Sequence, residues 1–188
     1  MSSRFLENQL LPPEYTLARV VPTAQELVYG YQQRWVSDDG AVRLGEAQYA
    51  LGMPQTPSVE EVALLLRDEY YNVERLMYAA AREIEAEGSP LEGEEPWRVW
   101  MFLAFSWALE HRSDYDDLMM ILQILWADFG YPLEIRDLIR WVSQWPGEPP
   151  VIDSLLPQWQ DYLSVKGAEY AERTARFAGD GWTPTNSG

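Results

Sequence analysis

Residues Trp97–Leu109 read WRVWMFLAFSWAL, and residues Leu118–Trp126 read LMMILQILW. The first stretch is polar at only two positions, so a helix formed from it has no polar face and must be surrounded by other helices. The second stretch is almost as apolar and predicts a second buried helix, antiparallel to the first. We therefore expect an all-α fold, a compact multi-helix bundle around two buried apolar helices at about 97–111 and 114–127.

Helix-start and helix-stop signals predict the elements before this pair. Thr23-Ala24-Gln25-Glu26 and Ser58-Val59-Glu60-Glu61 both have the form of a capping box, in which a hydroxyl and a Glu carboxylate accept bonds from free backbone N–H groups. The first predicts a helix at about 24–34. Between the two boxes, Asp38-Asp39-Gly40 is typical of a turn. Further helices are expected at about 42–51, from the second box onward, and from a cap at Asp68 to about residue 87.

The C-terminal part of the chain is also expected to be helical. Ser113 or Asp114 is a candidate cap for the second apolar helix, and Pro132 suits the first turn of a short amphipathic helix. A Pro- and Gly-rich loop at 145–150 precedes a last helix at 157–177, which Gly167 weakens. At 188 residues the chain fits a single helical domain (1–188), with a C-terminal helical extension at 153–178 and a flexible tail at 180–188.

Composition and charge limit the partners that we expect. The chain has no cysteine and its N-terminus lacks a signal-peptide pattern, so we expect a cytoplasmic protein. Its longest apolar stretch, Val99–Leu109, is shorter than the roughly 20 residues of a membrane span. Thirty acidic residues against fourteen Lys and Arg give a net charge of −16, which disfavours nucleic acid and anionic membranes. The natural complement is a basic macromolecule, although many acidic proteins carry such charge for solubility alone.

The sequence offers little support for catalysis. It contains no phosphate-binding glycine motif, no H-E-x-x-H and no G-x-S-x-G, so we predict a protein that is not an enzyme and has no cofactor or bound metal. The single histidine, His111, is close in sequence to three aspartates, which leaves a small metal-dependent enzyme around His111 as an alternative. The simpler interpretation places His111 at a helix C-terminus and the aspartates at the next N-terminus.

The candidate partner-binding residues are acidic, with one tyrosine. Residues 60–95 hold eleven acids and three arginines, a net charge of −8, and such a run is either a solvated face or a docking surface for a basic partner. Aromatic anchors among charges are typical of binding hot spots, and one tyrosine of the Tyr70-Tyr71 pair must face inward. The partner-binding residues that we predict are Asp68, Glu69, Tyr71, Glu92, Glu94, Glu95, Asp114, Asp116 and Asp117.

Three stretches together carry a family resemblance. They are ELVYGYQQRW at 26–35, WRVWMFLAFSWALEHR at 97–112, and YDDLMMILQILWADFGYP at 115–132. The sequence resembles a bacterial family, domain of unknown function 2247, over a family-like core at about 20–141. It departs from the family pattern at Leu118, where a proline is expected, and at Trp126, where a tyrosine is expected.

The resemblance implies a function only indirectly. Members of the family resemble the small acidic single-domain proteins that are encoded beside bacterial polymorphic toxins and act as immunity proteins. This resemblance implies an immunity protein or antitoxin-like inhibitor that binds a cognate, basic toxin domain, and opposite charge would speed that encounter. A nucleic-acid mimic or other acidic adaptor is the alternative among binding proteins. The oligomeric state is not predicted.

Overall fold

The computed structural model describes residues 10–86, 95–140 and 152–178, and these residues form helices and connections without any strand. The all-α bundle that the sequence predicts is therefore confirmed. The elements in chain order are α1 (Pro13–Leu17), α2 (Ala24–Gln32), α3 (Asp38–Ala50), α4 (Pro57–Ala63), the 3-10 helix η2 (Arg67–Asn72), α5 (Val73–Ala86), α6 (Trp97–Glu110), η3 (Arg112–Asp114), α7 (Leu118–Asp128), η4 (Leu133–Ile135), α8 (Arg136–Arg140) and α9 (Ile152–Ala178).

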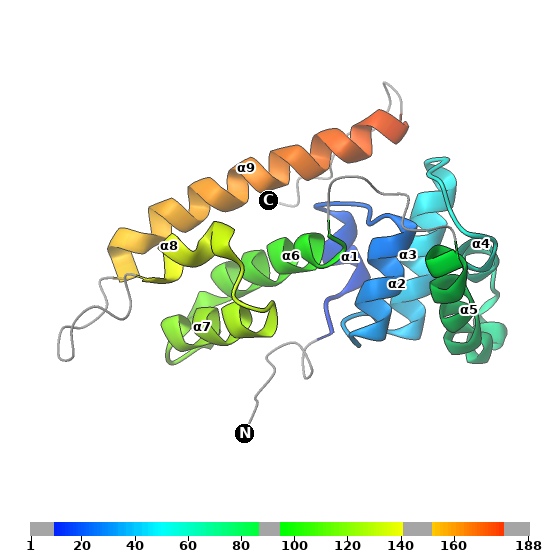
Figure 1. Cartoon of the computed structure of the whole chain (residues 1–188), viewed down its shortest axis with the longest axis horizontal. Helices are drawn as coiled ribbons and strands as arrows, with labels where there is room; N and C mark the ends of the chain where they lie inside the picture. The colour runs from blue at the N-terminus through cyan, green and yellow to red at the C-terminus, as the bar shows by residue number, and fades with distance from the viewer. Residues whose placement is uncertain (1–9, 87–94, 141–151, 179–188) are drawn as a thin grey trace.

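Helix α6 is the centre of the fold. Ten of its residues are buried, as the absence of a polar face predicts. In Figure 1, α2 to α5 gather toward one end of the long axis, α7 and α8 lie toward the other, and α9 runs along the molecule above α6. Helix α7 is buried along one side only, through Leu118, Met119, Leu122 and Leu125, while Met120 is half exposed.

A close approach between α2 and α6 is made at Gly30. The fully buried Trp100 ring of α6 lies against Gly30, so close that a Cβ added there would be 2.2 Å from Trp100 Cζ2. The Trp100 indole N–H also donates a 2.7 Å hydrogen bond to the Glu26 carbonyl oxygen. Only a residue without a side chain leaves room for this ring, so Gly30 sets how α2 packs on α6.

Helix α9 covers α6 and extends to α2. Its Trp159 stacks on Phe105 with the ring centroids 4.7 Å apart, and its Tyr170 packs on Phe102 at 5.1 Å. Further along, the Arg173 guanidinium donates to both carboxylate oxygens of Glu26, at 2.7 and 2.9 Å. The Glu26 side chain is only 4% exposed and that of Arg173 is 22% exposed, so this bidentate ion pair is largely shielded from water.

Two predicted helix starts are wrong in the N-terminal half. Asp38-Asp39-Gly40 is not a turn but the first turn of α3, because Ser37 caps this helix by accepting a bond from the Gly40 N–H. The second capping box is displaced, since Thr56 and not Ser58 is the N-cap of α4. The Ser58 hydroxyl instead donates to Glu83 of α5 at 2.6 Å. The first capping box, at Thr23 and Glu26, is confirmed.

Three further predicted boundaries differ from the structure. Asp68 does not cap α5, because it lies inside η2, whose last residue directly precedes Val73. Asp114 does not cap α7; Asp117 does, by accepting a 3.0 Å bond from the Met120 N–H. The last helix begins at Ile152 and not at residue 157, and contains a proline in its second turn. That proline is the sixth residue of the helix, beyond the N–H groups that lack an intrahelical acceptor, so it removes one backbone hydrogen bond close to the helix start.

Some predictions lie outside the described residues. They concern the N-terminal nine residues, the loop at 145–150 and the tail at 180–188. Among the helices that the structure describes, none is both long enough and apolar enough to cross a membrane.

Candidate functional site

Helix α5 has a buried face and a chemically distinctive outer face. Val73, Leu76, Met77 and Ala80 are buried against the core, at the i, i+3, i+4 spacing of one helical face. The opposite side of α5 therefore faces solvent. It presents two carboxylates, two arginines and a tyrosine, namely Glu74, Arg75, Tyr78, Arg82 and Glu85.

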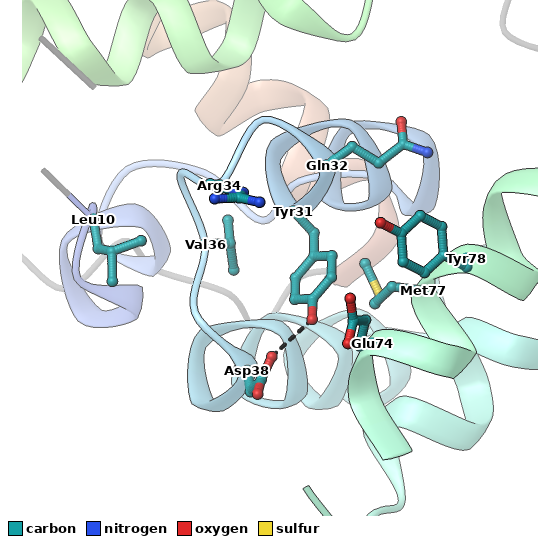
Figure 2. A pocket seen from close by; sticks show the side chains of 9 residues that line it. All are labelled: Leu10, Tyr31, Gln32, Arg34, Val36, Asp38, Glu74, Met77 and Tyr78. Atoms are coloured by element: carbon teal, nitrogen blue, oxygen red, sulfur yellow. Dashed lines mark hydrogen bonds between the residues drawn. The ribbon is translucent and has the colours of Figure 1, made fainter. Parts of the chain in front are cut away.

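This outer face borders a pocket between α2, α3 and α5 (Figure 2). The pocket has a volume of about 190 Å³. Cavities that hold drug-sized ligands typically measure about 300–1,000 Å³, so this one suits a single side chain or a small molecule. We call it the tyrosine–acid pocket; its lining residues are Leu10, Tyr31, Gln32, Arg34, Val36, Asp38, Glu74, Met77 and Tyr78.

The Tyr31 side chain is held in place at the centre of the pocket. Its hydroxyl donates a 2.8 Å hydrogen bond to Asp38 Oδ1, which joins the end of α2 to the start of α3 (Figure 2). Burial raises the pKa of Tyr31, and the hydrogen bond to Asp38 and the charge of that carboxylate raise it further. Tyr31 therefore remains a protonated donor at neutral pH, and its ring keeps one orientation.

Arg34 has an unusual backbone conformation at the edge of the pocket. Its φ of 62° lies in the left-handed region, where glycine is the usual residue. The Arg34 N–H bonds to the Tyr31 carbonyl oxygen and the Trp35 N–H to the Gly30 carbonyl oxygen, both at 2.9 Å. This pattern is a Schellman motif that ends α2, with arginine in the position that glycine normally fills. A left-handed conformation costs a side-chain-bearing residue roughly 1–2 kcal/mol.

Opposite charges occupy different parts of the pocket. Figure 2 shows Arg34 near the backbone end of Tyr31, whereas Asp38 and Glu74 lie near the hydroxyl end. Within the described part of the chain, the Arg34 guanidinium has no ion pair or hydrogen bond, and the Glu74 carboxylate likewise has none. Both groups are exposed, so each is accessible to a ligand.

One predicted group of binding residues adjoins this pocket. Asp68, Glu69 and Tyr71 lie in η2, which leads directly into α5. Tyr71 is 81% exposed and Tyr78 is 55% exposed, and with Glu74 they follow the i, i+3, i+7 spacing of a single helical face. Glu69 is half-buried and accepts a 2.9 Å hydrogen bond from the Leu66 N–H, so its side chain stabilises the backbone at the start of η2. We call Asp68, Tyr71, Glu74 and Tyr78 the η2–α5 surface.

The other predicted residues that the structure describes lie outside this surface. Glu92 and Glu94 lie outside the described residues. Glu95 is exposed before α6, where it accepts a hydrogen bond from the Trp97 indole N–H. Asp114, Asp116 and the helix cap Asp117 are exposed between α6 and α7, at the other end of the long axis from α5 (Figure 1). The predicted residues that the structure describes therefore lie in separate parts of the molecule.

His111 makes structural contacts at the C-terminus of α6. Its Nδ1 lies 2.9 Å from the Trp107 carbonyl oxygen, and its ring stacks on the Trp107 ring with centroids 3.9 Å apart. The position at the end of α6 agrees with the simpler interpretation of this histidine. In residues 10–86, 95–140 and 152–178, no cluster of three His, Cys, Asp or Glu side chains has an arrangement that could hold a metal ion.

A second hollow, of about 660 Å³, lies on α7 and α8. It is lined mainly by apolar side chains, such as Met120, Ile124 and Ile139, with Arg136 as its charged residue. The tyrosine–acid pocket, in contrast, combines aromatic rings with charges of both signs, and such convergent polar groups give a site its specificity. We therefore take the tyrosine–acid pocket and the η2–α5 surface as the candidate functional site.

Sequence reasoning found only part of this site. Tyr71 and Asp68 were detectable because they lie in an acidic and aromatic run, whereas Tyr31 and Arg34 belong to another helix, and Asp38 has the appearance of a turn residue. Glu74 and Tyr78 follow Tyr71 at helical spacing and lie opposite the apolar positions. This pattern in the sequence indicates the outer face of α5. Nothing in the sequence signals the left-handed backbone of Arg34.

Comparison with known proteins gives a family but no named relative. No curated protein and no solved structure matches the chain. The match to a family model covers residues 14–167, which is wider than the core at about 20–141 expected from the three motifs and includes α1 and much of α9. Since this model matches most of the chain, the protein belongs to the family described as an uncharacterized protein conserved in bacteria, DUF2247.

Proposed function

We propose that this protein binds a basic partner protein through the η2–α5 surface, and that it acts as an immunity protein that inhibits a cognate bacterial toxin domain. The observation that carries the proposal is the pair of exposed tyrosines, Tyr71 and Tyr78, set among carboxylates on one helical face. Tyrosine is enriched in binding hot spots, because its large rigid ring buries much area at low entropic cost. On a monomer, such rings gain little from exposure to water.

The charge of the chain supports a basic partner. A net charge of −16 attracts positively charged proteins over a distance and raises the rate of encounter, most strongly at low salt. The η2–α5 surface adds local acids, Asp68 and Glu74, beside its aromatic anchors. Membership of a bacterial family is compatible with an immunity role, which needs a stable scaffold and a complementary surface.

Affinity capture from the native host with matched bait proteins tests the binding proposal. The surface variant is Glu74→Gln with Tyr78→Ser. The control variant is Glu46→Gln with Tyr49→Ser, since both residues are exposed on α3 and the 51% exposure of Tyr49 is close to the 55% of Tyr78. We expect one basic protein in stoichiometric amount with the wild type and the control, its recovery falling as salt rises, and its loss with the surface variant.

Two results would contradict this reading. Equal recovery of the same proteins by both variants would show that the η2–α5 surface is not the interface. If the surface variant instead loses several nucleic-acid-binding proteins, this result would indicate a nucleic-acid mimic. Inhibition is then tested by expressing the captured partner in a host cell: the wild type and the control variant are expected to relieve its toxicity, and the surface variant is not.

A further inference from the structure

We infer that the tyrosine–acid pocket binds a C-terminal lysine or arginine residue, whose side-chain cation meets Asp38 and Glu74 and whose terminal carboxylate meets Arg34. The inference rests on the proposed function, since it names the part of the basic partner that enters the pocket. It also gives Arg34, Asp38 and Glu74 a common role, whereas a general preference for basic proteins would leave Arg34 without one.

The first step of the argument concerns Arg34. Side-chain-bearing residues in strained conformations cluster at binding sites, where the surrounding structure holds them in place. Here glycine at position 34 would end α2 through the same Schellman bonds without the left-handed strain. The backbone therefore gains nothing from arginine, and its guanidinium has no ion pair or hydrogen bond within the described part of the chain. A free guanidinium at the edge of a pocket is suited to a carboxylate.

The second step concerns the opposite end of the pocket. The Asp38 carboxylate is fixed by the Tyr31 hydroxyl, and the Glu74 carboxylate is free and exposed on α5. In Figure 2 the Tyr31 ring lies between these acids and Arg34, and Met77 lies between Glu74 and the Tyr78 ring. A cation over or beside a tyrosine ring gains further electrostatic stabilisation. This end therefore suits an ammonium or guanidinium group.

The third step combines the two ends. A ligand with a cation alone would leave Arg34 without a counter-charge, and a ligand with a carboxylate alone would be repelled by Asp38 and Glu74. A group that carries both charges on a short apolar chain satisfies each end, and its methylene groups can lie along Val36 and Met77. In a protein, one residue carries a side-chain cation and a carboxylate together only at the C-terminus, when that residue is lysine or arginine.

The test uses N-acetyl-lysine, which reproduces a C-terminal lysine, and two-dimensional NMR of isotopically labelled full-length protein. The comparison ligands are N-acetyl-lysine amide, which lacks the carboxylate, and N-acetyl-norleucine, which lacks the cation. We expect N-acetyl-lysine to shift the signals of Tyr31, Val36 and Met77 with a dissociation constant on the order of millimolar, and each comparison ligand to bind about tenfold more weakly.

Variants then separate the two ends of the pocket. Arg34→Gly is expected to remove the advantage of N-acetyl-lysine over its amide while leaving the melting temperature unchanged or higher, so that the loss is not unfolding. Glu74→Gln is expected to reduce the advantage over N-acetyl-norleucine. The matched control is Arg75→Gln, which removes an exposed arginine that is next in sequence to Glu74 and outside the pocket lining, and it should bind as the wild type does.

The inference fails if N-acetyl-lysine shifts none of the pocket signals, if its amide binds equally well, or if Arg34→Gly binds as tightly as the wild type. Stronger binding of free lysine than of N-acetyl-lysine would overturn the assignment to a chain end. These failures are distinct from failure of the proposed function, which is measured by capture of the partner on the η2–α5 surface. A captured partner without a response to N-acetyl-lysine would refute the pocket assignment alone.

Discussion

Replacing Gly30 by alanine is expected to destabilise the protein strongly, although alanine is the better helix former. In an open helix interior, Gly→Ala stabilises by up to about 1 kcal/mol. At Gly30 the added Cβ would be 2.2, 2.3 and 2.9 Å from three carbon atoms of the Trp100 ring, which is fully buried. These carbons need separations above 3.4 Å, so the ring or α2 must move by more than 1 Å.

The magnitude follows from two costs. Overpacking a well-packed core costs typically about 1–3 kcal/mol, and more when the displaced group is rigid. Movement of the Trp100 ring also strains its 2.7 Å hydrogen bond to the Glu26 carbonyl oxygen, and a buried donor left without its acceptor costs about 1–3 kcal/mol. After subtraction of the helix-forming gain, we expect a net loss of about 2–4 kcal/mol. For a chain of this size, that corresponds to a fall in melting temperature of roughly 5–15 °C.

Gly167→Ala provides a control with the same chemical change. Gly167 lies within α9, and an added Cβ would be 3.6 Å from the nearest atom of Phe102, which is ordinary van der Waals contact. This variant is therefore expected to be more stable than the wild type by about 0.5–1 kcal/mol. Thermal and urea unfolding of the two variants should give shifts of opposite sign. A Gly30→Ala protein as stable as the wild type would refute the packing of α2 against α6 described above.

Three further predictions concern polar groups. Glu26→Gln should lower the free energy of unfolding by about 3 kcal/mol in urea titrations, because it leaves the arginine of a largely buried ion pair without its counter-charge. Asp117→Ala should lower the free energy of unfolding by about 1 kcal/mol, because Asp117 caps α7, whereas Asp114→Ala should leave it almost unchanged. Equal losses for the two variants would contradict the assignment of Asp117 as the cap. Burial raises the pKa of Glu83, but hydrogen bonds from the Ser58 hydroxyl and backbone N–H outweigh it, so the net pKa is lowered. A lowered folded-state pKa stabilises the protein above the unfolded pKa, near 4.5, and this stabilisation disappears as the pH falls through the folded pKa. Acid unfolding of Ser58→Ala should therefore depend less steeply on pH below that value than that of the wild type.

The sequence predicts the helical core well because the relevant signal is local. The lack of a polar face at 97–109 identifies α6 as the central helix, and the capping box at Thr23 and Glu26 locates the start of α2. Errors arise where two residues compete for one role. Ser37, Thr56 and Asp117 are the caps, although an acid or a serine nearby has an equally good capping side chain.

The candidate site is harder to predict because it depends on tertiary contacts. Tyr71 was identifiable as one exposed member of a tyrosine pair, with Tyr70 packed against the core. The pocket itself needs α2 and α5 to lie close together, which brings Tyr31 within reach of residues more than forty positions away. The backbone conformation of Arg34 is equally invisible in the sequence, because it results from how α2 ends.

The ion pair between Glu26 and Arg173 joins opposite ends of the chain, and it does so across the limit of the family match at residue 167. A protease cut within the last turns of α9 would leave the Glu26 carboxylate without its guanidinium, although α6 would still be covered by Trp159. Helix α2 carries this carboxylate at its start and the pocket residue Tyr31 near its end. The C-terminal turns of α9 thus help to hold α2, the helix that carries Tyr31, in its position. Their removal is expected to raise the rate of amide hydrogen exchange in α2.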